Sequence, residues 1–175
     1  RVGSLRSALS THAEEAYLSL GAEEAKAAQW LFRQITQVTR SGRLVRRPQP
    51  WSLLSNHPKV ADAARKFRDP DLCFLRPVLP AALYPDTLID ITHESLMRQW
   101  ERLRSWATDE ARLRNIHADR HEDAQRWAAN NRDTAYLTYR GAWLRDVLRT
   151  RQAWTYPTEP IADEFLQAAQ IQEQH

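Results

Sequence analysis

Hydrophobic positions in the first forty residues recur at steps of three and four, the spacing of an amphipathic α-helix. A first helix is capped by Ser4 and ends at Gly21. Its predicted apolar face consists of Leu5, Leu9, Ala13, Ala16 and Leu20. A second helix follows and ends at Ser41-Gly42. Its predicted buried stripe consists of Ala28, Leu31, Phe32, Ile35 and Val38.

The pattern of residues 43–67 predicts a series of short elements. Residues 43–50 form a loop or a stub of strand, and residues 51–54 form a helical turn or two. A helix then opens at Pro58, because proline suits the first helical position. It directs one face inward, formed by Val60, Ala64 and Phe67, and one face outward, formed by Lys59, Arg65 and Lys66.

From residue 73 the pattern changes from helical to extended. Residues 73–79 and 88–93 are two strand candidates separated by a proline-rich loop. Helices followed by such a hairpin are the element order of a winged helix-turn-helix, with the hairpin as the wing. We therefore predict a winged-helix domain over residues 1–93.

Residues 94–175 predict a helical arm domain. Its strongest signal is a stripe at steps of four, three and four, formed by Leu96, Trp100, Leu103 and Ala107. We predict a break at residues 108–110, a helix to about residue 130, another over 133–150, and a last one from Thr158. The last helix buries Ile161, Phe165 and Ala169. The predicted fold class is mainly α, with one small β-hairpin.

Composition supports an ordinary globular protein. The 175 residues include seven Trp and four Phe for a core, and only four Gly. The single cysteine, Cys73, excludes an internal disulfide and indicates a reducing compartment, and its apolar neighbours predict a buried thiol.

No apolar run reaches the roughly 18 residues that span a bilayer, and no signal peptide precedes the first helix. We expect a cytoplasmic protein trimmed at both ends.

The charge gives little support for nucleic-acid binding. The net charge is +3, and its excess lies at Arg40, Arg43, Arg46 and Arg47, which we interpret as a solvated basic loop rather than a phosphate-binding patch. A rival hypothesis is a DNA-binding winged-helix regulator that inserts Lys59, Arg65 and Lys66 into the major groove. Asp62 and Asp69 would oppose it. A plain scaffold without a nucleotide role is a second rival.

No catalytic or metal site is predicted. His117 and His121 are one helical turn apart, a spacing that can chelate a metal, but Ala118 stands where a zincin has glutamate and no third ligand follows. We interpret them as a solvated helix face. Residue types that can serve as nucleophile and base also stand next to each other at residues 10–12 and 92–94. Sequence neighbours on one helix or strand do not face each other, so we assign no catalytic triad.

Two stretches resemble a known family. Val2-Gly3-Ser4-Leu5-Arg6-Ser7-Ala8-Leu9-Ser10-Thr11-His12-Ala13-Glu14-Glu15 resembles the opening of the winged-helix region in bacterial STAND NTPases, multidomain signalling ATPases related to NLR proteins and the apoptosome ATPase. Leu88-Ile89-Asp90-Ile91-Thr92-His93-Glu94-Ser95-Leu96-Met97-Arg98-Gln99-Trp100-Glu101-Arg102-Leu103 resembles the junction into the next helical domain. Trp127 and Trp154 also match tryptophan-centred helices of that group.

The resemblance implies a role for His93. In that family a histidine at the end of the wing, in the MHD motif, contacts the β-phosphate of ADP and latches the resting state. Thr92 and Glu94 replace the motif's Met and Asp. His93 also shares strand parity with Ile89 and Ile91, which predicts that it points inward, and it precedes a helix N-terminus that favours an anion. A structural histidine bonded to a carbonyl is the alternative.

The sequence contains no Gly-x-x-x-x-Gly-Lys-Ser/Thr loop. The resemblance therefore implies that the ATPase core lies upstream of Arg1 and a sensor downstream. ATP or ADP with Mg²⁺ would be cofactors of the full-length protein, and this fragment would hold none and not be an enzyme. Its partners would be its own ATPase core and sensor repeats, with oligomerisation on activation, no membrane and no nucleic acid. The expected function is regulatory: the module relays nucleotide state.

Overall fold

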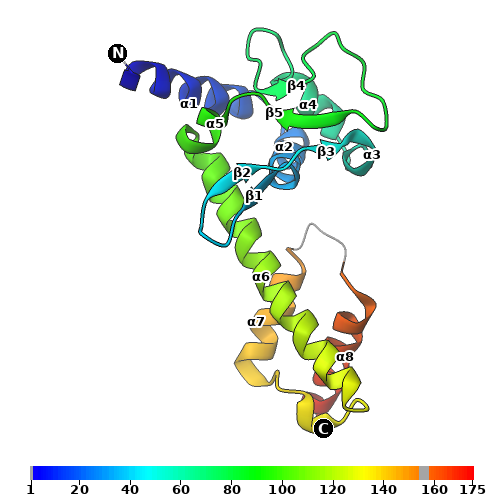
Figure 1. Ribbon diagram of the computed structural model, residues 1–175. Coiled ribbons are helices and arrows are strands. Elements are labelled where there is room, and N and C mark those ends of the chain that lie inside the picture. Colours follow the sequence, from blue (N-terminus) through cyan, green and yellow to red (C-terminus); the bar gives the residue numbers. More distant parts are fainter. Residues whose placement is uncertain (1, 154–157) are drawn as a thin grey trace. The chain divides into compact units, whose positions relative to one another are not determined.

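The computed structural model describes the backbone of residues 2–153 and 158–175 and the side chains of residues 8–153 and 158–175 (Figure 1). The predicted capping role of Ser4, the inward position of Leu5 and the match at Trp154 lie outside the described side chains. The elements are α1 (Val2–Leu18), α2 (Ala22–Gln34), β1 (Thr36–Val38), β2 (Leu44–Arg46), β3 (Gln49–Pro50), α3 (Trp51–Leu54), α4 (Val60–Phe67), β4 (Leu75–Arg76), β5 (Leu88–Ile91), α5 (Glu94–Gln99), α6 (Glu101–Ala129), η1 (Thr134–Tyr136), α7 (Gly141–Arg151) and α8 (Pro160–Gln174).

The chain forms two compact units, Arg1–Asp109 and Glu110–His175, called unit 1 and unit 2 below. The division lies at residue 109 rather than at the predicted boundary of 93. The reason is the Leu96–Ala107 stripe: its four apolar residues are buried, and Leu96, Trp100 and Leu103 belong to the core of unit 1. A stripe predicted to begin a separate domain therefore completes the first one.

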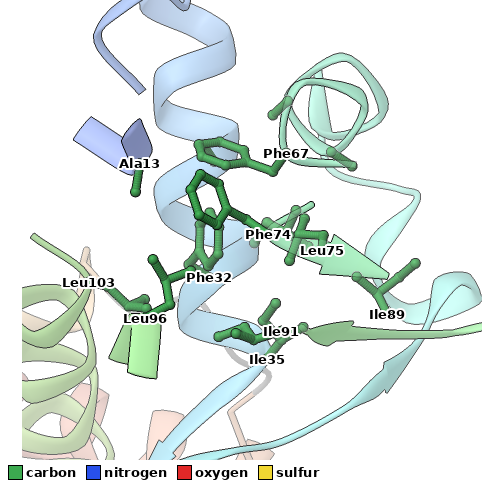
Figure 2. Close-up of a cluster of buried hydrophobic side chains, with 14 of the residues drawn as sticks. Ala13, Phe32, Ile35, Phe67, Phe74, Leu75, Ile89, Ile91, Leu96 and Leu103 are labelled. Atoms are coloured by element: carbon green, nitrogen blue, oxygen red, sulfur yellow. The ribbon is translucent and has the colours of Figure 1, made fainter. Parts of the chain in front are cut away.

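The core of unit 1 is apolar and rich in aromatic rings. Phe32 of α2 lies edge-to-face against Phe67 of α4, with ring centroids 5.0 Å apart, and against Trp100 at 5.3 Å. Strands β4 and β5 add Leu75, Ile89 and Ile91 to the same cluster (Figure 2). The outward face predicted for α4 is confirmed at Lys59 and Arg65, which are exposed, while Lys66 is half-buried.

Two small antiparallel sheets lie in unit 1. The predicted pairing of the two late strands is confirmed, with Leu75 opposite Ile91 and Arg76 opposite Asp90. Strand β3 adds to the other edge of β5, which gives the order β3-β5-β4. The second sheet is the hairpin β1–β2, which was not predicted.

The hairpin shows that the predicted second helix was too long. Helix α2 ends at Gln34, and Thr36 closes it by donating its hydroxyl to the carbonyl of Phe32 at 2.6 Å. The β-branched residues that follow prefer an extended chain, so Val38 pairs with Leu44 instead of continuing the helix. Gly42, with φ of +83°, makes the turn.

The helices after the wing strands break at a different place from the one predicted. The backbone leaves helical geometry at Trp100, with ψ of 101°, between α5 and α6. The predicted break at residues 108–110 is wrong, because α6 runs through it. Thr108 donates its hydroxyl to the Arg104 carbonyl at 2.8 Å, and Glu110 pairs with Arg114 one turn on at 3.3 Å. Both side chains bond within the helix instead of ending it.

Unit 2 contains the remainder of α6 with η1, α7 and α8. Its cluster includes Trp127, Tyr139, Leu144, Val147, Phe165 and Ala169. The predicted helix over 133–150 is only partly correct, because Asp133 caps the short η1 and α7 begins at Gly141. Burial of Phe165 and Ala169 is confirmed, and Ile161 is half-buried. No helix among the described residues is long and apolar enough to cross a membrane.

Candidate functional site

The candidate site lies where β5 leads into α5, because this junction carries His93. Ile89 and Ile91 point from β5 into the core and are fully buried. Asp90 lies between them in sequence and is 8% exposed. A carboxylate this buried requires partners, since an unpaired buried charge is costly.

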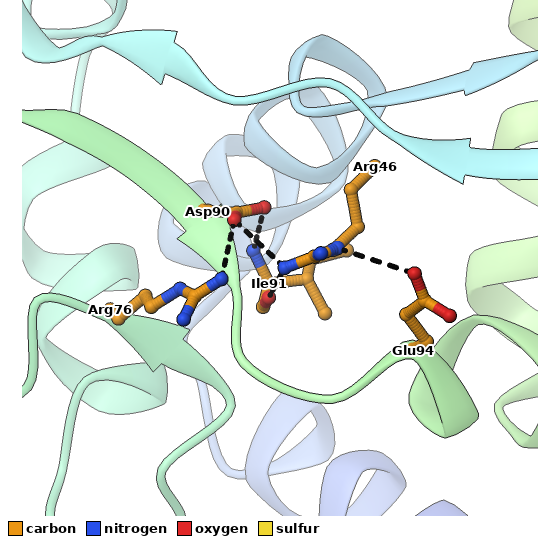
Figure 3. Close-up of polar contacts among 5 residues, drawn as sticks. All are labelled: Arg46, Arg76, Asp90, Ile91 and Glu94. Carbon is orange, nitrogen blue, oxygen red and sulfur yellow. Dashed lines mark hydrogen bonds and ion pairs between the residues drawn. The ribbon is translucent and has the colours of Figure 1, made fainter.

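Two arginines supply those partners (Figure 3). Arg76 of β4 donates from Nη2 to Asp90 Oδ2 at 2.9 Å, and Arg46 of β2 donates from Nη1 to the same oxygen at 3.1 Å. The other oxygen, Oδ1, accepts the backbone N–H of Ile91 at 2.8 Å. Arg46 also lies 3.8 Å from Glu94, at the start of α5.

This set of Arg46, Arg76, Asp90 and Glu94, called the Asp90 cluster below, joins β2, β4, β5 and α5. Charge-assisted hydrogen bonds of this kind are about twice as strong as neutral ones. The two arginines differ, because the side chain of Arg46 is 30% exposed and that of Arg76 is 51% exposed. The cluster therefore fixes the direction in which the chain leaves β5 and reaches His93.

His93 itself is exposed, so the prediction that it points inward is wrong. Strand β5 ends at Ile91, and the alternation of inward and outward side chains ends with it. His93 has φ of −121° and ψ of 121° and makes no side-chain capping bond to α5. Helix α5 has only six residues and carries Glu94 in its first turn, which weakens the predicted attraction for an anion.

A shallow cavity of about 350 Å³ lies beside the cluster. Its lining residues are Pro48, Arg76, Pro77, Thr87, Leu88 and Asp90. Leu88 is 56% exposed on the side of β5 opposite the core. Asp90 and Arg76 were not among the predicted site residues, although an aspartate inside the apolar run Leu88-Ile89-Asp90-Ile91 was the available signal.

The four arginines of the basic segment do not form one patch. Arg40 and Arg43 are exposed around the turn of the β1–β2 hairpin, whereas Arg46 and Arg47 are half-buried. On α4, Asp62 lies 4.0 Å from Lys59 and offsets part of its charge. The positive charge of these residues is therefore divided between the hairpin turn and α4.

The remaining candidates are His117 and His121 on α6, and Cys73. The rings of His117 and His121 stack at 6.3 Å, and His121 bonds Gln125 at 2.9 Å. Burial, then the charges of Arg120 and His121, lower the pKa of His117. Among the described residues no group of three or more His, Cys, Asp or Glu could hold a metal. Cys73 is half-buried with φ of +56°, less buried than predicted.

These features define a mainly helical protein with small antiparallel sheets, in which an ion-pair cluster holds a strand-to-helix junction. The chain belongs to the family described as novel STAND NTPase 1, which it matches over residues 1–135. This match supports the predicted relation to STAND NTPases. No curated protein and no solved structure matches the chain.

Proposed function

We propose that this chain is a regulatory module of a STAND-type signalling ATPase, and that it relays nucleotide state between an NTPase core and a sensor outside these residues. The observation that carries the proposal is the family match over residues 1–135, which includes all of unit 1. The absence of a phosphate loop from the sequence supports a regulatory rather than a hydrolytic role.

The proposal includes a winged helix in unit 1. If the β1–β2 hairpin is set aside, the order from α2 to β5 is helix, strand, helix, helix, strand, strand. These elements are α2, β3, α3, α4, β4 and β5. The first strand, β3, pairs with the last, β5, which also pairs with β4. This order and this pairing support the proposed winged helix-turn-helix, in which the β4–β5 hairpin is the wing. The β1–β2 hairpin is then an insertion between the first helix and the first strand.

Within this module we assign His93 to the contact with the β-phosphate of ADP. Its exposure leaves the imidazole available to a partner, and the Asp90 cluster holds the backbone that carries it. ATP or ADP with Mg²⁺ would bind the NTPase core, which together with the sensor would be the partner of this chain. Oligomerisation would follow release of the contact.

The first test uses residues 1–175 alone. We expect this chain neither to hydrolyse ATP nor to bind ADP more tightly than about 1 mM, because a single histidine contact provides only a small part of a nucleotide site. Calorimetry measures both. Micromolar ADP binding would contradict the assignment of the nucleotide to another domain.

The second test uses the longer protein that contains the NTPase core. A charge-assisted hydrogen bond contributes roughly 1.5–3 kcal/mol, so His93→Ala should shift the closed-to-open ratio about 10- to 150-fold. We expect faster ADP release and oligomerisation without a trigger. His12→Ala is the matched control, because His12 is also exposed but lies on α1. Unchanged release in the His93 variant would make it a structural residue.

A further inference from the structure

A second cavity, of about 450 Å³, lies within unit 2 between α6 and α7. Its lining residues are Arg112, Ile116, Trp143, Asp146, Val147, Arg149 and Thr150. The volume is within the range of small-molecule sites, roughly 300–1,000 Å³. The α7 wall lies beyond residue 135, where the family match ends, so the STAND relation does not account for it.

The cavity has an aromatic wall that the fold does not bury. Trp143 is 55% exposed, although neighbouring Leu144 and Val147 on the same helix are 3% and 2% exposed. Its ring lies edge-to-face against Tyr139, with centroids 5.9 Å apart, and more than half of the residue's surface stays exposed. Together with Ile116, it offers a flat apolar surface that suits a planar ring.

The charges around this surface are uneven. Asp146 lies 3.6 Å from Arg149, so this pair is neutral overall. Arg112 is exposed on α6 and, among the described contacts, has no carboxylate partner. The hydroxyl of Thr150 donates to the carbonyl of Val147 at 2.8 Å and leaves its lone pairs available. The cavity therefore combines an apolar wall with one uncompensated positive charge.

We propose that this cavity binds a small aromatic monoanion, whose ring stacks on Trp143 and whose carboxylate pairs with Arg112. Apolar walls with a few convergent polar groups are the usual composition of such sites. A planar ring gains contact with Trp143 and Ile116, and the single charge of the ligand matches the single free charge of the cavity. The proposal is independent of the nucleotide role of His93.

The probe is 2-naphthoate, with 2-naphthylmethanol as the neutral molecule of the same ring system. The indole N–H resonance of Trp143, identified by its loss in Trp143→Phe, is followed in the intact chain among the seven tryptophans. We expect 2-naphthoate to shift it with a Kd on the order of 0.1–1 mM, as for a ligand of this size. The neutral molecule should bind more weakly, by up to about five-fold, the value of an exposed ion pair.

Arg112→Gln should raise the Kd for 2-naphthoate by the same factor and leave that of the alcohol unchanged. Arg145→Gln is the matched control, because Arg145 is exposed on α7 but does not line the cavity. Trp143→Ala lacks the reporter resonance, so its binding is followed by saturation transfer to 2-naphthoate; we expect this transfer to disappear while the thermal midpoint stays close to that of the wild type. Three results would overturn the proposal: no shift up to about 10 mM, equal binding of both probes, or a Trp143 signal that moves on dilution without ligand, which would assign the surface to a second copy.

Discussion

The two units of this protein differ in what shifts the pKa values of three of their side chains: Glu14 in unit 1, and His117 and Tyr139 in unit 2. In unit 1, Glu14 accepts from Arg102 Nε at 2.7 Å and from the Trp100 indole at 2.9 Å, and the hydrogen bond from Arg102 is the main reason that its pKa is lowered. In unit 2 burial favours neutral forms. It lowers the pKa of His117 and raises that of the Tyr139 hydroxyl, which also donates to Asp123 at 2.8 Å.

Because of this difference, we expect the two units to lose stability at different pH values. Unit 1 has a large aromatic cluster, and its buried carboxylate, Asp90, is bonded to two arginines, so this unit should resist mild acid. Unit 2 has a smaller cluster and includes Arg120, which is 0% exposed, near His117 and Tyr139. Its stability should therefore depend on protonation near neutral and alkaline pH.

The largest loss of stability is expected from a substitution in the aromatic cluster of unit 1. Trp100 is 1% exposed, and Trp100→Ala should lower the free energy of unfolding by roughly 3–5 kcal/mol. Chemical denaturation followed by hydrogen exchange should place the loss in the amides of unit 1. Trp143→Ala, which removes a 55% exposed ring, is the control and should cost far less. Equal losses would mean that burial does not distinguish the two rings.

The second prediction concerns the Asp90 cluster. Asp90→Asn keeps the shape but weakens two charge-assisted bonds, so we expect a loss of about 1–3 kcal/mol. Both arginines remain partly solvated, which limits the cost. Asp62→Asn is the control, because its side chain is 50% exposed and 4.0 Å from Lys59, and it should change stability by less than about 0.5 kcal/mol. Urea denaturation of both variants provides the comparison.

The third prediction concerns alkaline pH in unit 2. The pKa of Tyr139 is raised in the folded protein, so its contribution is complete below the unfolded value of about 10 and is lost as the pH rises above it. Tyr139→Phe should cost about 0.5–1.5 kcal/mol at pH 7 and flatten the alkaline decline. Thermal melts of both proteins from neutral to alkaline pH test this. Parallel pH profiles for the two proteins would contradict it.

The smallest effect concerns mild acid. Because the pKa of His117 is lowered, the unfolded chain takes up a proton below its unfolded value, about 6.5, before the folded chain does. Stability of unit 2 should fall as the pH drops through this value, by less than about 1.4 kcal/mol per pH unit, the limit for one proton. His117→Gln should reduce that slope. His12→Gln, at an exposed position, should leave it unchanged.

Glu14 gives the corresponding expectation for unit 1 and sharpens the contrast. Its folded pKa is lowered, so its contribution is complete above the unfolded value of about 4.3 and is lost as the pH falls below that value. Unit 1 should therefore begin to weaken at a lower pH than unit 2. Hydrogen exchange at pH 5 and pH 7 compares the two units directly. Simultaneous loss of protection in both would show that they unfold together.

The sequence by itself determined the elements whose burial follows a period. The stripe Leu96–Ala107, the inward face of α4 and the pairing of β4 with β5 were all predictable, because alternation and helical spacing are local properties. The relation to STAND NTPases also followed from linear motifs.

Only the tertiary structure decided where these elements end and what surrounds the site. The backbone leaves helical geometry at Trp100, and the indole of this residue bonds Glu14, which is 86 residues away. The partners of Asp90 come from β2 and β4, 44 and 14 residues away. His93 turned outward because its strand ended two residues earlier. Such contacts depend on which distant segments meet, and a periodic pattern carries no information about that.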